Sequence, residues 1–550
     1  MLVNWRIKIN FFLLQKSSVV GDLDKNFKII EKSFKKCVSN DCDFFLTTEL
    51  FLTGYPPQDL ILRNDFLKKV QIYKKKIKAL TKNKKSILLL NIPEKNNDKI
   101  FNTLFLFKNG STVYKKTKSI LPNYGVFDEK RYFYVKKSNV PDFEYKNKKI
   151  RFLICEELWS ENLMIKSKKN INYLICINAS PYEINKYDMR KKIAARNAKF
   201  FKTNVIYLNY IGCQDELVFD GGSFAMNKKA EIIYQSDFFK ESEKIINIER
   251  IENKKIPKIN YDKQSQIYFA LIRSLQNYMK NNNFKKSIIG LSGGIDSALC
   301  LMIAVDALKS ENVKCFYLPT IYNSKKSQRD AYELAKNLNV EIDTISIEML
   351  RKKINSELNP FFQNKPKDVT EENIQSRLRG LLLMSISNKF NSLLITTGNK
   401  SELAIGYSTL YGDMCGGFSL IKDLYKTQVS ELSKWRNTTV PDFCSLKIKG
   451  LIPESIILKE PSAELKLNQK DEDSLPKYSV LDKILELIID KNYDLQSIKK
   501  YGFNEKLIKK IWNMLKNAEF KRYQSAIGPK ISSMSFDKDR RFPITNKFKI

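Results

Sequence analysis

Three residues in the first half of the chain have the side chains needed for acyl transfer without histidine. Cys155 follows an apolar run and offers a thiol nucleophile, Glu49 follows a second apolar run and offers a general base, and Lys118 offers a cation. Glu156 and Glu157 come directly after Cys155, so we expect a raised thiol pKa and a requirement for a neighbouring base or cation. The same residues also fit structural roles as a core thiol, a polar strand end and one of 80 lysines. Spacing alone leaves both interpretations open.

Histidine is absent from all 550 residues. Mechanisms that need imidazole, such as Ser-His-Asp triads, Cys-His pairs and His-ligated metals, are therefore excluded. Any general base must be a carboxylate or a lysine. The nine cysteines are odd in number and show no CxxC spacing, which argues for a reducing compartment and against disulfides or a zinc cluster. We expect a cytoplasmic protein.

A second stretch with chemical character covers residues 287–297, which read SIIGLSGGIDS. Its β-branched run, Ser-Gly-Gly turn and following amphipathic run predict a strand, a glycine loop and a helix N-terminus. Backbone N–H groups of such a turn form an anion site together with the helix dipole, and Gly293 and Gly294 allow close approach. Ser292 and Ser297 add hydroxyl donors. The G-K-[ST] ending of a Walker A motif is missing, and a tight βα connection with capping serines is the alternative.

The elements that position these residues are predicted to form two domains, because a chain of 550 residues is too long to fold around a single hydrophobic core. Residues 1–250 form the first α/β domain, residues 251–263 a polar, lysine-rich linker, and residues 264–550 the second. Residues 5–14 carry Arg and Lys within an apolar run and read as a first strand. No uncharged run of membrane-spanning length follows, so no membrane partner is expected.

Apolar β-type runs alternate with helical periodicity in both halves. Buried strands are expected at 87–92, 152–155 and 173–177, and helices at 26–38 and 189–203. The second half is predicted to contain a helix from Gln264, an amphipathic helix over 298–308, long loops at 359–372 and 458–476, and helical runs over 481–521.

The formal net charge of +36 raises nucleic acid as a partner. However, 80 lysines outnumber 16 arginines, and arginine is the preferred bidentate reader of phosphates and bases. The lysines are also spread along the chain beside many Asn and Ile. We therefore interpret them as solvated faces and expect no nucleic-acid partner.

The first half contains three segments with a recognisable pattern: ELFLTGYPP (49–57), KSILPNYGVFDE (118–129) and ICEELW (154–159). They resemble the three signature segments of the nitrilase-type amidases and occur in the family's order. The resemblance implies an αββα fold in which Glu49 is the general base, Lys118 the intermediate-stabilising cation and Cys155 the nucleophile.

This match identifies the reactive lysine and shows two differences from the family pattern. The Leu-Pro-Asn-Tyr anchor that follows Lys118 selects it over Lys115 and Lys116. Glu157 stands where the family usually has Asp, and residues 151–152 replace a segment before the cysteine that usually contains glycine. Neither departure falls on the three reactive positions.

The second half contains SGGIDS (292–297), through which it resembles the ATP-pyrophosphatase ligases. Five further segments follow: ENIQSRLRG (372–380), TTGNKSE (396–402), YGDMCGG (411–417), LNQKDEDSLP (467–476) and FKR (520–522). These five are similar to segments of NAD synthetases. The resemblance implies a Rossmann-like, adenine nucleotide α-hydrolase-like domain that adenylylates its substrate and releases pyrophosphate.

An amidase followed by a synthetase is the layout of the glutamine-dependent NAD synthetases. The resemblance implies a carbon–nitrogen ligase that amidates deamido-NAD to NAD with ATP, Mg²⁺ and ammonia from L-glutamine, releasing AMP, pyrophosphate and glutamate. A protected ammonia route and a homo-oligomer are implied as well. Carried over by position, Tyr124, Ser180 and Lys186 hold glutamine; Gly290, Leu291, Ser292, Gly293, Gly294, Ile295, Asp296, Ser297 and Thr397 hold ATP; Asn373, Glu402 and Lys521 hold deamido-NAD; Asp296 and Glu402 are available to the metal.

Two interpretations from other classes compete with this one. A tRNA-modifying ATP-pyrophosphatase agrees with the basic charge and the glycine loop, but it predicts an RNA-binding domain where the chain has an amidase-like half. A scaffold whose amidase half only mediates assembly would not need Cys155 for glutamine use.

Overall fold

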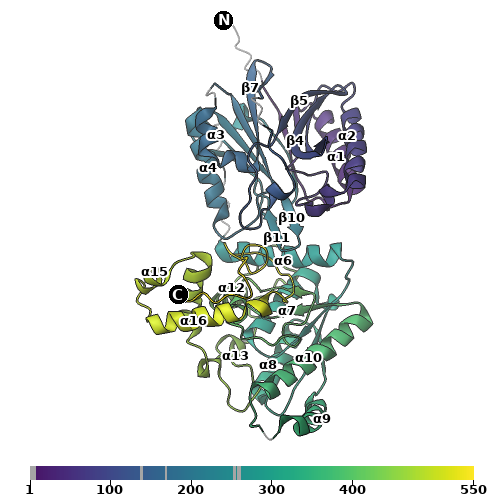
Figure 1. Cartoon of the computed structure of the whole chain (residues 1–550). Coiled ribbons are helices and arrows are strands. Elements are labelled where there is room, and N and C mark those ends of the chain that lie inside the picture. Colours follow the sequence, from purple (N-terminus) through teal and green to yellow (C-terminus); the bar gives the residue numbers. More distant parts are fainter. Residues whose placement is uncertain (1–7, 137–139, 168–169, 252–255, 257–261, 364) are drawn as a thin grey trace. The chain divides into compact units, whose positions relative to one another are not determined.

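The computed structural model describes residues 8–136, 140–167, 170–251, 256, 262–363 and 365–550. The chain divides into two units, Met1–Asn260 and Tyr261–Ile550, which are described separately (Figure 1). Most of the predicted linker 251–263 lies outside the described residues. The helix α5 (Ile248–Ile251) ends at the first residue of this linker, and α6 (Lys263–Asn281) begins at its last residue.

Two six-stranded sheets form the centre of the first unit, in the orders β14-β1-β2-β3-β4-β5 and β13-β12-β9-β8-β7-β6. The inner strands of both sheets are parallel and apolar on both faces, as expected for strands that are covered on each side. The bounds are β1 Phe11–Gln15, β2 Phe44–Leu46, β3 Ile87–Asn96, β4 Lys99–Lys108, β5 Ser111–Thr117, β6 Phe143–Tyr145, β7 Lys148–Ile154, β8 Tyr173–Asn178, β9 Asn204–Asn209, β12 Phe224–Met226, β13 Ile232–Gln235 and β14 Ser242–Ile246, with a separate hairpin of β10 Ile211–Gln214 and β11 Leu217–Asp220.

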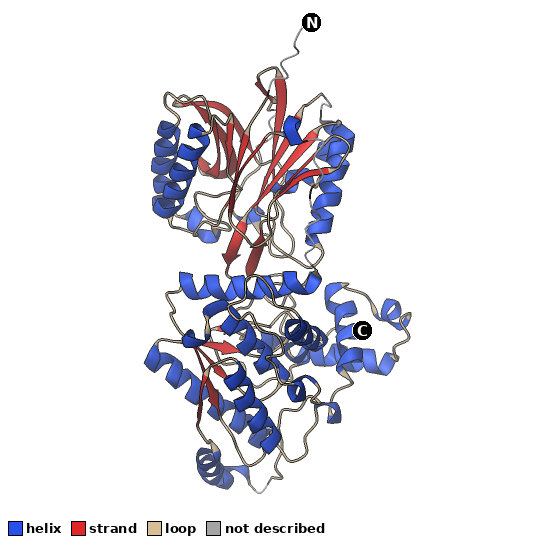
Figure 2. Ribbon diagram, turned by 180° about the vertical axis from the view of Figure 1, so that it is seen from behind, coloured by secondary structure: helices blue, strands red, loops and turns tan. Residues whose placement is uncertain are grey.

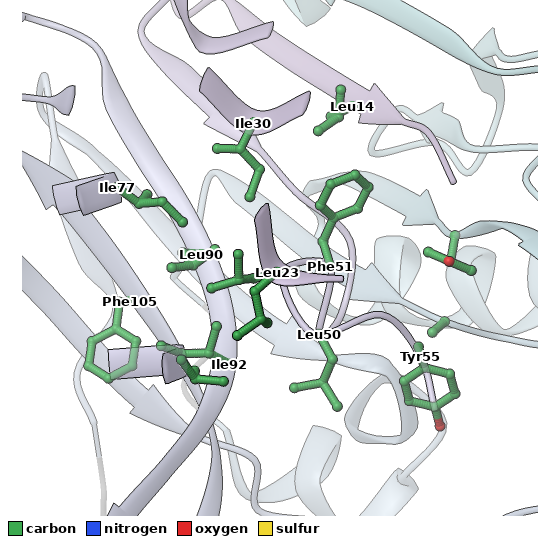
Figure 3. Packing of buried hydrophobic residues seen from close by; sticks show 14 of the residues in the cluster. Leu14, Leu23, Ile30, Leu50, Phe51, Tyr55, Ile77, Leu90, Ile92 and Phe105 are labelled. Atoms are coloured by element: carbon green, nitrogen blue, oxygen red, sulfur yellow. The ribbon is translucent and has the colours of Figure 1, made fainter. Parts of the chain in front are cut away.

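Side-chain alternation along β1 explains how the layers stack. Phe11 and Leu13 pack in one cluster with Ile154 and Ile175 of the other sheet, so the two sheets face each other. Phe12 and Leu14 point the other way, into a cluster with residues of the helices α1 (Leu23–Ser39) and α2 (Asn64–Leu80) that Figure 3 shows from close by. The result is the predicted αββα arrangement, with α1 (Leu23–Ser39) and α2 (Asn64–Leu80) outside one sheet and α3 (Glu161–Lys166) and α4 (Lys186–Phe201) outside the other (Figures 1 and 2).

A five-stranded parallel sheet, in the order β17-β16-β15-β18-β19, forms the centre of the second unit. The central strand β15 has β16 on one side and β18 on the other. After β15, the chain first adds strands on one side of it and then on the other, so the strand order reverses at β15. Ligands bind beyond the carboxyl ends of the strands at such a point. The bounds are β15 Ser287–Gly290, β16 Val313–Tyr317, β17 Glu341–Thr344, β18 Leu393–Thr396 and β19 Phe418–Ser419.

Helices surround this sheet, and two of the expectations for them are wrong. The helix α7 (Ile295–Leu308) was expected to be amphipathic, but residues 297–306 are all buried, because the helix is covered on every side. The expected long loop at 359–372 is short, since η5 (Asn359–Phe362) and α10 (Val369–Phe390) occupy most of it. The remaining helices are α6 Lys263–Asn281, α8 Lys325–Asn337, α9 Glu348–Leu358, α11 Lys400–Ile405, α12 Lys426–Thr438, α13 Glu454–Ile457, α14 Tyr478–Leu485, α15 Leu495–Lys499, α16 Glu505–Asn517 and α17 Glu519–Arg522.

Most of the other expected elements are present within one to four residues at each end, and the loop over 458–476 contains only the short η6 (Asp471–Asp473). The first strand, expected over 5–14, begins at Phe11, and residues 5–7 lie outside the described residues. Within the described ranges, no helix combines the length and apolar character that crossing a membrane requires.

Candidate active sites

The structure brings Glu49 and Lys118 into direct contact in the first unit. Lys118 Nζ lies 2.7 Å from Glu49 Oε1 and 2.8 Å from Glu129 Oε1. Asn102 Nδ2 also donates to Glu49 Oε1 at 2.9 Å. The second carboxylate oxygen, Glu49 Oε2, is buried without a hydrogen-bond partner among the described residues, so it remains available as a base.

Each of the three reactive residues follows a strand of the two facing sheets. Glu49 comes three residues after β2, Lys118 directly after β5, and Cys155 directly after β7. The expected strand over 152–155 therefore ends one residue early. Cys155 begins the 3₁₀ helix η3 (Cys155–Leu158) with a φ of 45°, in the left-handed region. Backbone strain of this kind is concentrated at functional sites.

Cys155 is 4% exposed, and the charges of Glu49 and Lys118 act on it. Burial raises the pKa of its thiol well above the ordinary value, Glu49 raises it further, and Lys118 opposes them. The rise agrees with the sequence prediction, but its cause differs. Glu49, rather than the neighbouring Glu156 and Glu157, is the leading carboxylate.

One buried lysine serves two carboxylates in this site. Burial lowers the pKa of Lys118, but Glu129 and Glu49 outweigh it and place that pKa well above its usual value. Since one ammonium balances only one negative charge, the second carboxylate retains a proton more readily. Burial accordingly raises the pKa of Glu129 to about 7, although Lys118 opposes the rise.

The predicted glutamine-binding residues have different surroundings. Tyr124 donates to Glu156 Oε2 at 2.9 Å, which places it next to the residue after Cys155. Lys186 Nζ lies 5.4 Å from the centre of the Trp159 ring, just beyond η3. Ser180 is buried, and its hydroxyl accepts from Arg190 Nε at 3.1 Å. Tyr124 and Lys186 thus flank the segment that begins with Cys155, while Ser180 is engaged by a buried arginine.

A cavity of 290 Å³ lies beyond the carboxyl ends of β15, β16 and β18 in the second unit. The loop over 458–476 supplies part of its wall through residues 459–465 and Asp471. Eight of the nine predicted ATP-binding residues line it: Gly290, Leu291, Ser292, Gly294, Ile295, Asp296, Ser297 and Thr397.

Gly293 is the predicted ATP-binding residue outside the lining, and its role is to form the turn. Its φ is +77°, and an added Cβ would lie 2.3 Å from the carbonyl oxygen of Ser327. Only glycine fits there. The hydroxyls of Ser292 and Ser297 lie 3.1 Å apart, and Ser292 Oγ accepts from the N–H of Gly294. These hydrogen bonds of the two serines stabilise the loop.

The predicted metal-binding carboxylates, Asp296 and Glu402, both line the cavity and share one lysine. Lys426 Nζ donates to Asp296 Oδ2 and lies 3.2 Å from Glu402 Oε1. Burial raises the pKa of Glu402 to about 8 although Lys426 opposes the rise. Carboxylate oxygens are the donors that Mg²⁺ prefers, and two carboxylates line this cavity, so these residues fit the ion.

Two of the predicted deamido-NAD residues, Asn373 and Lys521, lie outside the cavity lining. Both contact the segment that follows α11. Lys521 Nζ donates to the carbonyls of Gly406 and Ser408 at 2.8 and 2.7 Å, and Asn373 Oδ1 accepts from Thr409 Oγ1 at 2.8 Å. Glu402, the third, lines the cavity itself.

Sequence reasoning missed Glu129 and Lys426 as members of these sites. Glu129 ends the amidase-like segment 118–129, but the resemblance assigns it no role. Lys426 is one of 80 lysines and lies in none of the recognised segments. The signal that distinguishes it is its burial between two carboxylates, which only the fold creates.

Comparison with known proteins gives each unit a counterpart. The family model for carbon–nitrogen hydrolases matches residues 13–255, and the model for NAD synthase matches residues 267–525. The glutamine-dependent NAD(+) synthetase of Acinetobacter baylyi is 40% identical over 540 residues, covering 97% of this chain and 98% of that protein. The synthetase of Thermotoga maritima is 37% identical over 587 residues, covering 98% and 99%.

A solved structure gives the same result. The glutamine-dependent NAD+ synthetase from Acinetobacter baumannii in complex with ADP matches with a TM-score of 0.77 and 38% identity, covering 98% of each chain. The fold and the two sites thus define a carbon–nitrogen hydrolase joined to an NAD synthase in one polypeptide. The chain belongs to the family of glutamine-dependent NAD(+) synthetases. The family, fold class and enzyme class predicted from the motifs are confirmed.

Proposed function

We propose that this chain converts deamido-NAD to NAD, with ATP as co-substrate and L-glutamine as the source of ammonia. The single observation that carries the proposal is that one chain of this family has both sites. The first unit has a buried Glu49–Lys118 contact beside Cys155, and the second unit has a cavity at the glycine loop. The first site releases ammonia, and the second consumes it.

In the first site, Cys155 attacks the side-chain amide carbon of glutamine. Glu49 takes the thiol proton through its unpartnered Oε2 and returns a proton to the departing ammonia. Lys118 stabilises the oxyanion of the tetrahedral intermediate, since its ammonium is fixed between two carboxylates. Glu49 then activates the water that releases glutamate from the thioester. Tyr124, Ser180 and Lys186 hold the substrate.

In the second site, the loop from Gly290 to Ser297 and Thr397 hold ATP in the cavity. The carboxylate of deamido-NAD attacks the α-phosphate and pyrophosphate leaves, after which ammonia displaces AMP. Because the loop lacks a Walker lysine, it suits a pyrophosphate leaving group. Asn373, Glu402 and Lys521 hold deamido-NAD.

Asp296 and Glu402 would hold Mg²⁺ in the second site. The ion supplies charge neutralisation, without which a triphosphate and a carboxylate repel each other. Lys426 contributes a fixed positive charge beside the same carboxylates.

The proposal includes a protected route for ammonia between the two sites, because free ammonia is mostly protonated at neutral pH. It also includes a homo-oligomeric, cytoplasmic enzyme with domain limits near residues 250 and 264. The test is an assay of the purified protein with ATP, Mg²⁺, deamido-NAD and either glutamine or ammonium. We expect NAD and AMP in equal amounts with both nitrogen donors. Adenylate transfer to tRNA instead would favour the tRNA-modifying alternative.

A further inference from the structure

Glu157 connects the two chain segments that carry Lys118 and Cys155. Its side chain is completely buried, and each carboxylate oxygen accepts two hydrogen bonds. Oε1 accepts from the N–H and the hydroxyl of Ser119 at 2.8 and 2.6 Å. Oε2 accepts from Lys116 Nζ at 2.6 Å and from the N–H of Ile154 at 2.8 Å. All four donors come from the two segments.

These donors are immediate neighbours of the reactive residues. Ser119 follows Lys118, and Ile154 precedes Cys155. The strands β5 and β7 belong to different sheets, so no ladder of backbone hydrogen bonds sets one against the other. The Glu157 carboxylate makes a polar connection between them at the site itself.

Lys116 completes the connection. Its ammonium donates to Glu157 Oε2 and, at 2.8 Å, to the carbonyl of Phe152 in β7. Lys116 thus connects the end of β5 to β7 through Phe152 and to η3 through Glu157. The adjacent Lys115 differs, since its side chain is 50% exposed and pairs with Glu94 on the same sheet. Of these two consecutive lysines, Lys116 is largely buried and Lys115 is half exposed.

We infer that Glu157 and Lys116 are positioning residues of the glutaminase site, which hold Cys155 at its working distance from Lys118 and Glu49. This inference rests on the proposed function of Cys155 as the nucleophile. Neither residue touches the reacting atoms. Glu157 remains ionised in this role, because Lys116 and Ser119 outweigh the effect of burial and leave the pKa of its carboxyl below the usual value.

The test compares Glu157→Gln and Lys116→Met with Lys115→Met as the matched control. Glutamine keeps the shape of Glu157, but its amide nitrogen is a donor that would face two donors. We expect kcat for glutamine hydrolysis to fall about 10- to 100-fold in both variants, with little change in KM, because misplacement of a nucleophile acts on the chemical step. Lys115→Met is expected to match the wild-type chain.

Alkylation of Cys155 by iodoacetamide, followed across pH by mass spectrometry, separates positioning from folding. A purely structural role would reduce the fraction of reactive Cys155 but leave kcat per reactive site and the pH profile unchanged. We expect both to change. The inference is overturned if soluble Glu157→Gln and Lys116→Met behave like Lys115→Met, or if both variants fail to fold. If the wild-type chain hydrolyses no glutamine, the proposed function fails instead.

Discussion

Lys118 Nζ lies 2.7 Å from Glu49 Oε1, and neither side chain has any solvent exposure. The same ammonium contacts Glu129 at 2.8 Å. Burying three ionisable groups costs free energy that packing with apolar residues would avoid. The cost is understandable if the lysine must present a fixed positive charge, and the base an unpaired oxygen, to a substrate beside Cys155.

Replacing Lys118 by Met should abolish glutamine hydrolysis and destabilise the first unit. The substitution leaves Glu49 and Glu129 buried without their cation, and breaking such a pair costs about 3–5 kcal/mol. Urea unfolding and glutamine hydrolysis measure the two effects. Lys115→Met, which removes a half-exposed ion pair, should cost about 1 kcal/mol or less. Equal stability of the two variants would contradict the role of Lys118.

Glu129 should make the stability of the first unit depend on pH. Its pKa is raised from 4.5 to about 7, so between these values the folded chain binds more protons than the unfolded chain. Stability therefore falls as pH rises from about 4.5 to about 7. Glu129→Gln removes this loss, and its unfolding free energy relative to the wild type should increase across the same window by up to about 3 kcal/mol. Urea unfolding at several pH values measures the difference, and a constant difference would count against the raised pKa.

Local sequence patterns predicted more of the fold than of the contacts within the sites. Apolar runs were sufficient to place β3 and β8, and the Leu-Pro-Asn-Tyr anchor selected Lys118 over Lys116. The partners of these residues were not predictable in the same way, because Glu157 and Lys426 act through contacts between segments far apart in the sequence. The burial of α7 on every side also depends on what packs around it, which its own residues do not specify.

The turn at Gly293 should not tolerate a side chain. Gly293→Ala would incur the cost of a left-handed φ, about 1–2 kcal/mol, and would also push against the carbonyl of Ser327. We expect loss of NAD synthesis with either nitrogen donor and a lower unfolding free energy. Gly450→Ala is the control, since Gly450 has a φ of +67° but no atom within 4 Å of an added Cβ. If the two variants are equally stable, the close approach to Ser327 has no energetic effect.

Removal of divalent cations should stop the reaction of the second site but not that of the first. With EDTA, NAD and AMP formation should stop with glutamine and with ammonium, because the triphosphate loses its neutralising charge beside Asp296 and Glu402. Glutamine hydrolysis measured without the other substrates should continue, since the proposed chemistry of the first site uses the side chains of Glu49, Lys118 and Cys155 and no metal ion. Added Mg²⁺ should restore synthesis. Synthesis that persists without metal would contradict the assignment.

The most direct test of two cooperating sites is NAD formation by Cys155→Ala with glutamine or with ammonium as nitrogen donor. Cys37→Ala, another buried cysteine of the same unit, is the control for loss of a thiol. We predict that Cys155→Ala makes no NAD from glutamine but keeps wild-type synthesis from ammonium, whereas Asp296→Ala loses both. Continued synthesis from glutamine by Cys155→Ala would contradict the central claim.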